Sequence, residues 1–192
     1  KTAVITPFGL FEFLVMPFGV RNAAQSFQRL MDRVLDGLPF CFVYLDDILI
    51  ASATREEHRD DVRAVLQCLH EHGLVINPAK SIFCQRSVEY LGHQVTATGI
   101  SPLEKTKAAL IDFPAPVSRQ DLQRFLGMLN FYRRFLPSAA AILHPLTEAL
   151  KGGKGTKLEW TEVCQTSFQA AKTMLTEAVE LHHPVPGAPV GL

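Results

Sequence analysis

The sequence lacks any long apolar run and any paired cysteine motif. No stretch of about 18 consecutive apolar residues occurs in the 192-residue chain, so no membrane-spanning helix is expected. Four isolated cysteines and no CxxC pair disfavour a zinc site and indicate reduced thiols in an intracellular protein. The first residues, KTAVITPFGLFEF, carry neither an initiator methionine nor a signal-peptide pattern. We therefore expect the chain to begin inside a longer protein.

An excess of charge of one sign is also absent, because 19 basic side chains balance 19 acidic ones. The charges are unevenly placed: residues 1–99 carry 9 basic and 11 acidic side chains, whereas residues 100–160 carry 9 and 5. A basic middle segment is compatible with a phosphate-backbone partner, and equally with an ordinary solvated surface. With 47% hydrophobic residues, the chain can bury a sizeable core in one or two domains.

The first half of the sequence mixes strand and helix patterns. Residues 4–19 predict short strands joined by turns, because they are apolar and contain Pro-Phe-Gly twice. A helix is expected from Asn22, capped by Asn22 and Gln25 and ended by Gly37. A second is expected from Thr54, with a capping box to Glu57.

The second half is mainly helical by pattern. A helix is expected over residues 101–113, another from Ser118 with Asp121 as its capping partner, a short one before residue 152, and a last one through residues 164–175. Two of these helices have an apolar stripe, at Leu122, Phe125, Leu126 and Leu129 and at Cys164, Phe168, Ala171 and Leu175. Residues 182–192 are rich in proline and glycine and predict an open tail. The fold class is therefore α+β, with a boundary near residue 98 between a mixed part and a helical part.

Two adjacent acids, Asp46 and Asp47, interrupt an apolar strand-like run at residues 40–50. The simplest geometry is a β-hairpin with the acids at its tip. A polar turn explains most such pairs, because aspartate is a common turn residue. Paired carboxylates on rigid strands can also hold Mg²⁺ for phosphoryl transfer. The pair alone leaves both interpretations open.

The flanking segments favour the second interpretation. Tyr44-Leu45-Asp46-Asp47 resembles the Tyr-x-Asp-Asp box of reverse transcriptases. Ordered resemblances to the Ty3/gypsy class of long-terminal-repeat retrotransposons cover essentially the whole chain. Residues 11–32 resemble the segment before the box, and residues 72–83 the motif after it. The primer grip follows at residues 88–96, the thumb at 121–151 and the linker to RNase H at 158–178. Several motifs in family order are far more specific than one.

The resemblance implies RNA-directed DNA polymerase activity by two-metal nucleotidyl transfer. Asp46 and Asp47 would bind Mg²⁺, with Mn²⁺ as the alternative ion, and Asp46 would be the more direct ligand. Tyr44 and Leu45 would lie near the primer terminus and the nucleotide, although both also suit a plain strand.

Further residues are assigned by position. Phe18, Gly19 and Arg21 match the nucleotide pocket, Lys80 the triphosphate contacts, and Asn22 and Gln25 the template contacts. A turn at residues 17–19, a surface Lys80 and a helix cap by Asn22 are the structural alternatives. The family usually has Asn-Ala-Pro where this chain has Asn-Ala-Ala at residues 22–24.

The primer grip and thumb follow in the second half. Tyr90, Leu91, Gly92 and His93 match the primer grip, and Arg124 and Arg133 would face duplex phosphates. Neighbouring arginines at 133 and 134 cannot both face one way on a helix, and Phe131 and Tyr132 are better suited to a core.

The resemblance also implies a domain plan and partners. Residues 1–98 would be a partial palm, residues 99–152 a helical thumb, and residues 153–192 the start of a connection. Partners would be an RNA or DNA template with its primer, dNTPs, and the rest of a Pol polyprotein, with fingers upstream and RNase H downstream. A membrane is not among them, and a cytoplasmic particle or the nucleus is the expected location.

A third catalytic aspartate would lie upstream of residue 1, so the isolated chain should be inactive. The competing hypothesis is a non-catalytic remnant that binds nucleic acid or protein.

Overall fold

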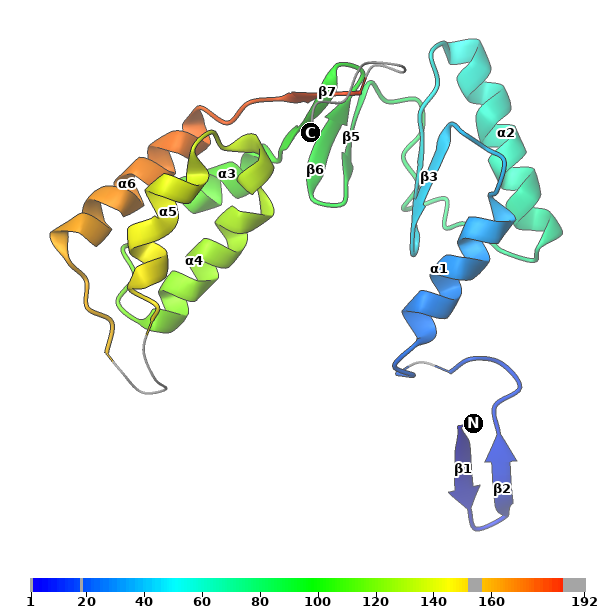
Figure 1. Cartoon of the computed structure of the whole chain (residues 1–192). Coiled ribbons are helices and arrows are strands. Elements are labelled where there is room, and N and C mark those ends of the chain that lie inside the picture. The colour runs from blue at the N-terminus through cyan, green and yellow to red at the C-terminus, as the bar shows by residue number, and fades with distance from the viewer. Residues whose placement is uncertain (1, 18, 152–156, 185–192) are drawn as a thin grey trace. The chain divides into compact units, whose positions relative to one another are not determined.

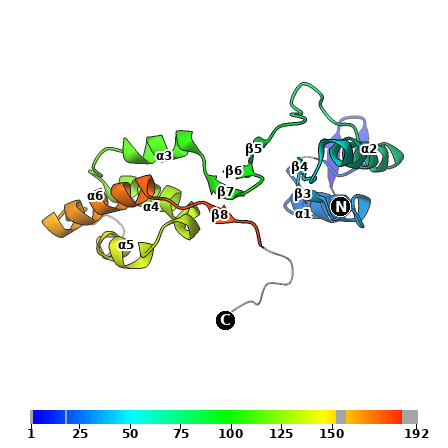
Figure 2. The same cartoon turned by 90° about the horizontal axis from the view of Figure 1, so that it is seen from above.

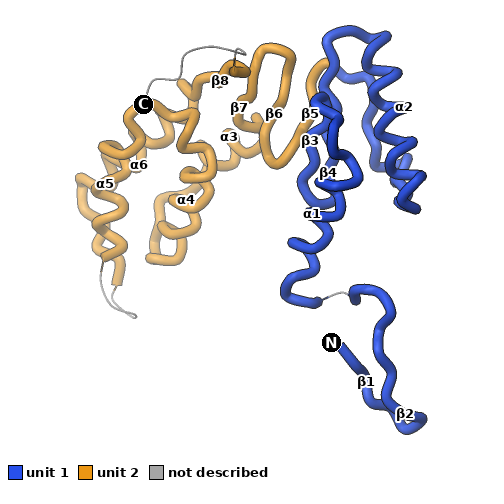
Figure 3. Tube along the Cα trace, turned by 45° about the vertical axis from the view of Figure 1, so that its right-hand side comes forward, with its two compact units in different colours: residues 1–85 blue, residues 86–192 orange. Residues whose placement is uncertain are grey.

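A computed structural model describes residues 2–17, 19–151 and 157–184 of the chain. The fold is α+β, as the sequence predicts, and it divides into two compact units, Lys1–Gln85 and Arg86–Leu192 (Figure 3). The chain divides between residues 85 and 86, whereas the boundary predicted from the sequence, near residue 98, separates a proposed palm from a proposed thumb. Each unit is described separately below.

The first unit begins with an exposed hairpin. Strands β1 (Ala3–Thr6) and β2 (Gly9–Glu12) pair antiparallel across the first Pro-Phe-Gly segment, which confirms the expected strand and turn. The side chain of Phe8 at the turn is 91% exposed. Within the turn, the Thr6 hydroxyl donates to the Gly9 carbonyl at 3.0 Å. A φ of 135° at Gly9 explains why glycine follows the turn.

The core of the first unit lies between two helices and a second hairpin. Helix α1 (Ala23–Val34) and helix α2 (Arg55–Glu71) flank strands β3 (Cys41–Tyr44) and β4 (Asp47–Ile50) (Figure 1). Five side chains are buried there: Met31, Val34, Leu35, Val65 and Leu69. Val43, Ile48 and Ile50 of the hairpin pack against them. Alternation along β3 leaves Phe42 and Tyr44 exposed on the other face.

The two predicted caps of this unit have different outcomes. At α2 the Thr54 hydroxyl accepts from the Glu57 N–H, and the Glu57 carboxylate accepts from the Thr54 N–H, so this capping box is confirmed. Helix α1 begins where expected, but the Asn22 side chain makes no cap hydrogen bond. The predicted box between Asn22 and Gln25 is therefore wrong. At Asn22, φ and ψ are −103° and 9°, outside the extended region of a capping residue.

The second unit combines a small sheet with a helical layer. Strands β5 (Ser87–Tyr90), β6 (His93–Thr96), β7 (Gly99–Pro102) and β8 (Leu181–His182) form an antiparallel sheet in chain order. Helices α3 (Glu104–Ile111), α4 (Arg119–Phe131), α5 (Ala139–Glu148) and α6 (Glu162–Thr176) form the core, with a 3₁₀ turn at Arg133–Phe135. Helix α6 packs against α3 and α5 (Figures 1 and 2).

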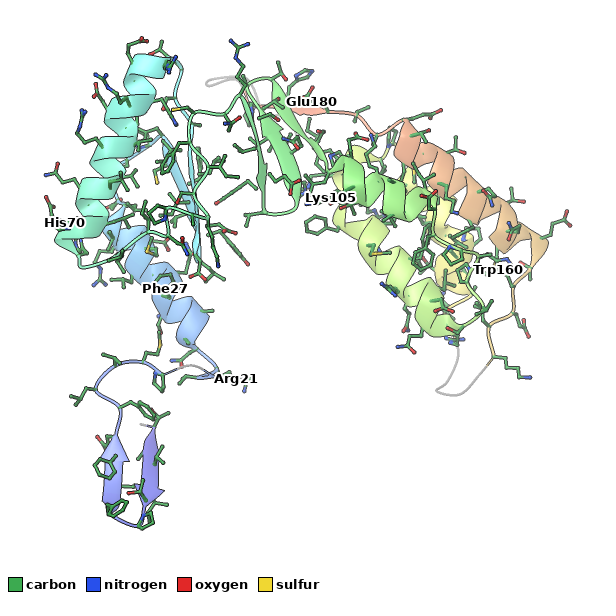
Figure 4. The ribbon with its side chains drawn as sticks, turned by 180° about the vertical axis from the view of Figure 1, so that it is seen from behind. Arg21, Phe27, His70, Lys105, Trp160 and Glu180 are labelled. Atoms are coloured by element: carbon green, nitrogen blue, oxygen red, sulfur yellow. The ribbon has the colours of Figure 1, made fainter. Side chains whose placement is uncertain are left out.

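Periodicity located the helical core correctly. The predicted stripe of α4 is buried at all four positions, Leu122, Phe125, Leu126 and Leu129, and that of α6 at Cys164, Phe168, Ala171 and Leu175. Trp160 packs edge-on against Phe168 at 5.7 Å, and Figure 4 shows it beside these helices. The capping box of Ser118 and Asp121 is confirmed.

Two expectations fail at residues that pair in the sheet. Residues 101 and 102 belong to β7 rather than to a helix, because His93 pairs with Pro102 and Gln94 with Ser101. The helix starts only at Glu104. His182 was expected in an open tail, yet it pairs with Gly99, and Leu181 before it pairs with Ile100. The rest of that tail, residues 185–192, lies outside the described residues.

The packing of β8 on Gly99 predicts the effect of a methyl group. A Cβ on Gly99 would lie 2.9 Å from the Leu181 carbonyl carbon and closer still to its oxygen. We expect Gly99→Ala to lower the free energy of unfolding by roughly 1–3 kcal/mol and to raise amide hydrogen exchange at Leu181.

The matched control is Gly127→Ala on α4, where an added Cβ meets nothing within 4 Å. That change should leave the stability equal or raised, by up to about 1 kcal/mol. Equal exchange at Leu181 in both variants would mean that β8 does not depend on the close approach to Gly99.

Candidate active site

The two adjacent acids lie at the end of the β3–β4 hairpin. Tyr44 pairs with Asp47, so Leu45 and Asp46 form a two-residue turn. Asp46 is therefore in the turn itself and Asp47 is the first residue of β4. Both side chains are exposed. The expected hairpin with acids at its tip is confirmed.

The turn contains a residue in a rare conformation. Leu45 has a φ of 51°, in the left-handed region that disfavours a side chain of this size. A residue held there costs on the order of 1–3 kcal/mol and persists only where surrounding contacts determine it. The positive φ suits a two-residue hairpin turn, whose twist matches that of the strands.

The contacts that determine the turn come from α1. The Gln28 side chain accepts a hydrogen bond from the Leu45 N–H at 2.6 Å and donates one to the Val43 carbonyl at 3.2 Å. It also donates to the Asp32 carboxylate at 2.7 Å. Sequence analysis missed Gln28. The available signal was its place on the inner face of the helix, one turn before Met31 and two turns before Leu35.

The donor set at the tip suits a hard cation in part. Among the described residues, neither the Asp46 nor the Asp47 carboxylate has a hydrogen-bond or ion-pair partner. Their oxygens are the ligands that Mg²⁺ prefers. The described part of the chain contains no group of three or more His, Cys, Asp or Glu side chains that could hold a metal ion. Within the described residues, the hairpin thus offers two carboxylates and no third such ligand.

Other predicted residues of this unit lie apart from the turn in sequence. Gly19 and Arg21 precede α1, and Figure 4 shows Arg21 at the start of that helix. Phe18 lies outside the described residues. Gln25 is exposed in the first turn of α1. Lys80 is exposed in a turn whose backbone bonds to Asn77 at 3.1 Å. These positions leave the nucleotide and template roles as predictions.

The predicted primer-grip residues form a second tight hairpin. Tyr90 pairs with His93, and Leu91 and Gly92 make the turn with φ values of 47° and 78°. Two positive φ values characterise a type I′ turn, in which glycine is favoured. A Cβ on Gly92 would also lie 3.1 Å from the Phe131 ring, so glycine allows a close approach to α4.

His93 points into an aromatic cluster formed by Phe131, Tyr132 and Phe135. It stacks on Phe131 at 4.9 Å, and the other two rings lie 5.7 and 5.5 Å away. Nδ1 lies 2.9 Å from the Leu91 carbonyl oxygen, which can only accept, so Nδ1 carries the hydrogen. Nε2 is buried without a hydrogen-bond partner among the described residues. The imidazole therefore serves packing, while Leu91 beside it is exposed.

Tyr132 also anchors this hairpin, since its hydroxyl donates to the Gly92 carbonyl at 2.8 Å. The sequence-based choice of Tyr132 as a core residue is confirmed, because it is buried; Phe131 is half exposed while covering His93. Arg124 and Arg133 are exposed, on α4 and on the 3₁₀ turn. Arg134 lies over the Phe135 ring at 5.8 Å. Duplex contacts by the two exposed arginines remain a prediction.

Comparison with known proteins finds similarity over both halves of the chain. Residues 1–95 match the model of the family described as reverse transcriptase (RNA-dependent DNA polymerase). The Retrovirus-related Pol polyprotein from transposon 297 of Drosophila melanogaster is 39% identical over 161 residues, covering 83% of this chain and 15% of that protein. The corresponding polyprotein from transposon opus of the same species is 37% identical, covering 96% of this chain and 19% of its own length.

A solved structure extends the similarity to the fold. The foamy viral protease-reverse transcriptase in complex with RNA/DNA hybrid superposes with a TM-score of 0.82 at 26% identity, covering 94% of this chain and 25% of that protein. The chain thus spans less than a fifth of the length of the transposon polyproteins that it matches. The fold is thus that of a segment of a reverse transcriptase, and the acidic hairpin lies within that segment. Residues 1–95 are similar to the reverse transcriptase family, and the similarity to a Pol polyprotein extends over the rest of the chain.

The buried imidazole predicts a pH dependence of stability. Burial lowers the pKa of His93, the Arg134 charge acts in the same direction, and the bond to Leu91 opposes them. Between the ordinary pKa near 6.5 and the lower folded pKa, the unfolded chain binds more protons than the folded one. Stability should therefore fall as the pH drops through 6.5.

Urea unfolding at pH 8.0, 6.5 and 5.5 measures this effect. His93→Phe keeps an aromatic ring but cannot titrate, so its stability should change less over this range than that of the wild type. His144→Gln is the control, because His144 is an exposed histidine whose one ion-pair contact among the described residues is a long surface contact, 3.6 Å from Glu148. A pH profile of His93→Phe that follows the wild type would contradict the assignment.

Proposed function

We propose that the chain is the part of an RNA-directed DNA polymerase that carries two catalytic carboxylates, the primer grip and a thumb. The observation that carries this proposal is the β3–β4 hairpin, which presents Asp46 and Asp47 side by side within a segment of the reverse transcriptase family. The motif order and the transposon relatives support an element of the Ty3/gypsy class.

Asp46 and Asp47 would hold Mg²⁺ through their carboxylate oxygens. Mg²⁺ held there would supply positive charge for nucleotidyl transfer, in which the primer 3′ oxygen bonds to the α-phosphorus of a dNTP and pyrophosphate leaves. The residues of this chain would contribute position: the hairpin presents the exposed carboxylates of Asp46 and Asp47 at its end, directly after the positive-φ residue Leu45. Missing ligands would come from a segment outside these 192 residues.

The domain plan follows from the same proposal. Residues 1–98 would supply palm elements, residues 99–152 the thumb, and residues 153–192 the start of a connection. Leu91 and Gly92 would meet the primer through exposed backbone at the second hairpin turn. The RNA/DNA hybrid held by the foamy viral protein supports a hybrid duplex as the partner of this chain. dNTPs, a fingers region and an RNase H region complete the proposed set of partners.

Substitution of the hairpin acids tests the activity. In the protein translated from the full reading frame, Asp46→Asn should lower primer extension on an RNA template at least about 100-fold, because loss of a metal ligand removes several kcal/mol of transition-state stabilisation. Asp60→Asn on α2 is the control, since Asp60 is exposed and pairs only with Arg63 at the surface. Full extension by Asp46→Asn would contradict the role of Asp46 as a metal ligand, whereas a wild-type protein that extends no primer would favour the competing hypothesis of a remnant that only binds nucleic acid or protein.

The two-carboxylate site also predicts how the isolated chain behaves. Purified residues 1–192 should incorporate no nucleotide with Mg²⁺ and a primed template, because the described residues supply no third ligand near the pair. The assay should be sensitive enough to detect about a thousandth of the rate of the longer protein. Incorporation that disappears in Asp46→Asn would overturn the incomplete-site argument.

A further inference from the structure

Gln28 is a polar, half-buried residue of α1 that touches the acidic hairpin rather than solvent. Its amide bonds to the backbone on both sides of Tyr44, at the Val43 carbonyl and the Leu45 N–H. The two bonds link residues that are 15 and 17 positions away in sequence. A third bond to Asp32, one helical turn further on, sets the orientation of the amide.

The amide completes hydrogen bonding that the hairpin leaves open. β3 pairs with β4 along one side, and within the described residues no strand pairs with its other side. Alternate residues of a strand turn their polar groups toward the partner and away from it. The Val43 carbonyl and the Leu45 N–H face away from β4, and the Gln28 side chain takes the place of a neighbouring strand for these two groups.

Only an amide satisfies this pair of groups. The Val43 carbonyl can only accept and the Leu45 N–H can only donate, so the partner needs a donor and an acceptor on one planar end. Glutamine provides both at this length. Glutamate would place an oxygen against the Val43 carbonyl, and methionine would leave both groups without a hydrogen bond. The identity of residue 28 is therefore set by the hairpin.

The bond to Leu45 acts on the residue that separates Tyr44 from the acids. Leu45 has the positive φ of the turn, and no glycine is present to relieve it. At 2.6 Å, the Gln28 oxygen holds the N–H of that residue directly. A change in the Leu45 backbone would rotate the following peptide and redirect Asp46.

We propose that Gln28 is a positioning residue for the catalytic carboxylates. It fixes the Leu45 backbone, and through it the direction of Asp46 and Asp47, without touching substrate or metal. The role in catalysis rests on the polymerase function proposed above. The structural part, a turn held by a side-chain amide, stands independently of that function.

The experiment uses Gln28→Met in the protein translated from the full reading frame. The first measurement is hydrogen exchange of the segment 44–47 by mass spectrometry, which should become at least tenfold faster. The second is steady-state primer extension. We expect kcat to fall about tenfold or more and the Mg²⁺ concentration for half-maximal rate to rise severalfold, because small displacements of reacting groups are costly. The Kd for primer–template should stay within twofold.

Gln67 of α2 supplies a matched control. Its side chain donates to Glu71 at 3.0 Å across one helical turn, as Gln28 does to Asp32, and Gln67 is exposed. Gln67→Met should leave exchange at 44–47, kcat and the Mg²⁺ requirement unchanged. If Gln28→Met loses cooperative unfolding, Gln28→Glu replaces it, with Gln67→Glu as its control, because both put like charges one turn apart.

The outcomes separate the two proposals. Faster exchange at 44–47 together with lower kcat and a higher Mg²⁺ requirement supports the positioning role. Wild-type exchange and kcat within twofold in Gln28→Met overturn it, and so does a loss of activity with an unchanged Mg²⁺ requirement. A wild-type protein that extends no primer refutes the polymerase function, while the exchange measurement still decides whether Gln28 holds the turn.

Discussion

The pairing of Tyr44 with Asp47 is the constraint on which the candidate site depends. It limits the connection between β3 and β4 to two residues, so Asp46 and Asp47 must leave the hairpin at its end. Val43, Ile48 and Ile50 behind the turn pack against α1 and α2, which keeps the ladder in one register. A slip by one residue would direct the apolar set outward, so the same packing that stabilises the unit also places the acids.

Two hairpins of the chain have the same kind of two-residue turn, and different contacts hold each turn. Both close a Tyr-Leu-x-x turn, and in both the leucine has a φ near 50°. The first is held by a glutamine amide from a helix. The second has glycine as its next residue and is held by the Tyr132 hydroxyl on the Gly92 carbonyl. Acids can stand at the first tip because that tip is open, whereas the second tip is pressed against an aromatic ring and needs a residue without a side chain.

Local sequence patterns predicted the features that lie within one helix, and they failed where strand pairing determines the structure. The capping boxes at Thr54 and Ser118 and the stripes of α4 and α6 were predicted because each lies within a few turns of one helix. Ser101 was misassigned because its pairing with Gln94 in the adjacent strand overrides the local helix pattern. His182 was misassigned because its partner Gly99 lies in a strand far earlier in the chain. At Asn22 the residue type suits a cap, but the backbone takes another conformation. The acidic pair was predictable from its motif; the Gln28 contact was not, because a helix pattern does not show which polar residue meets a strand.

The return of β8 to β7 has a consequence for how the second unit is made. Glu180 accepts from the hydroxyls of Thr96 and Thr98, across 84 and 82 residues. Helices α3 to α6 all lie between these partners in the chain. During synthesis the first three strands leave the ribosome long before the fourth, so the sheet gains its last strand only after the helices have been made. Closure of such a long loop is slow relative to local helix formation. We therefore expect strand β8 to be the last of the described parts of this unit to take its place.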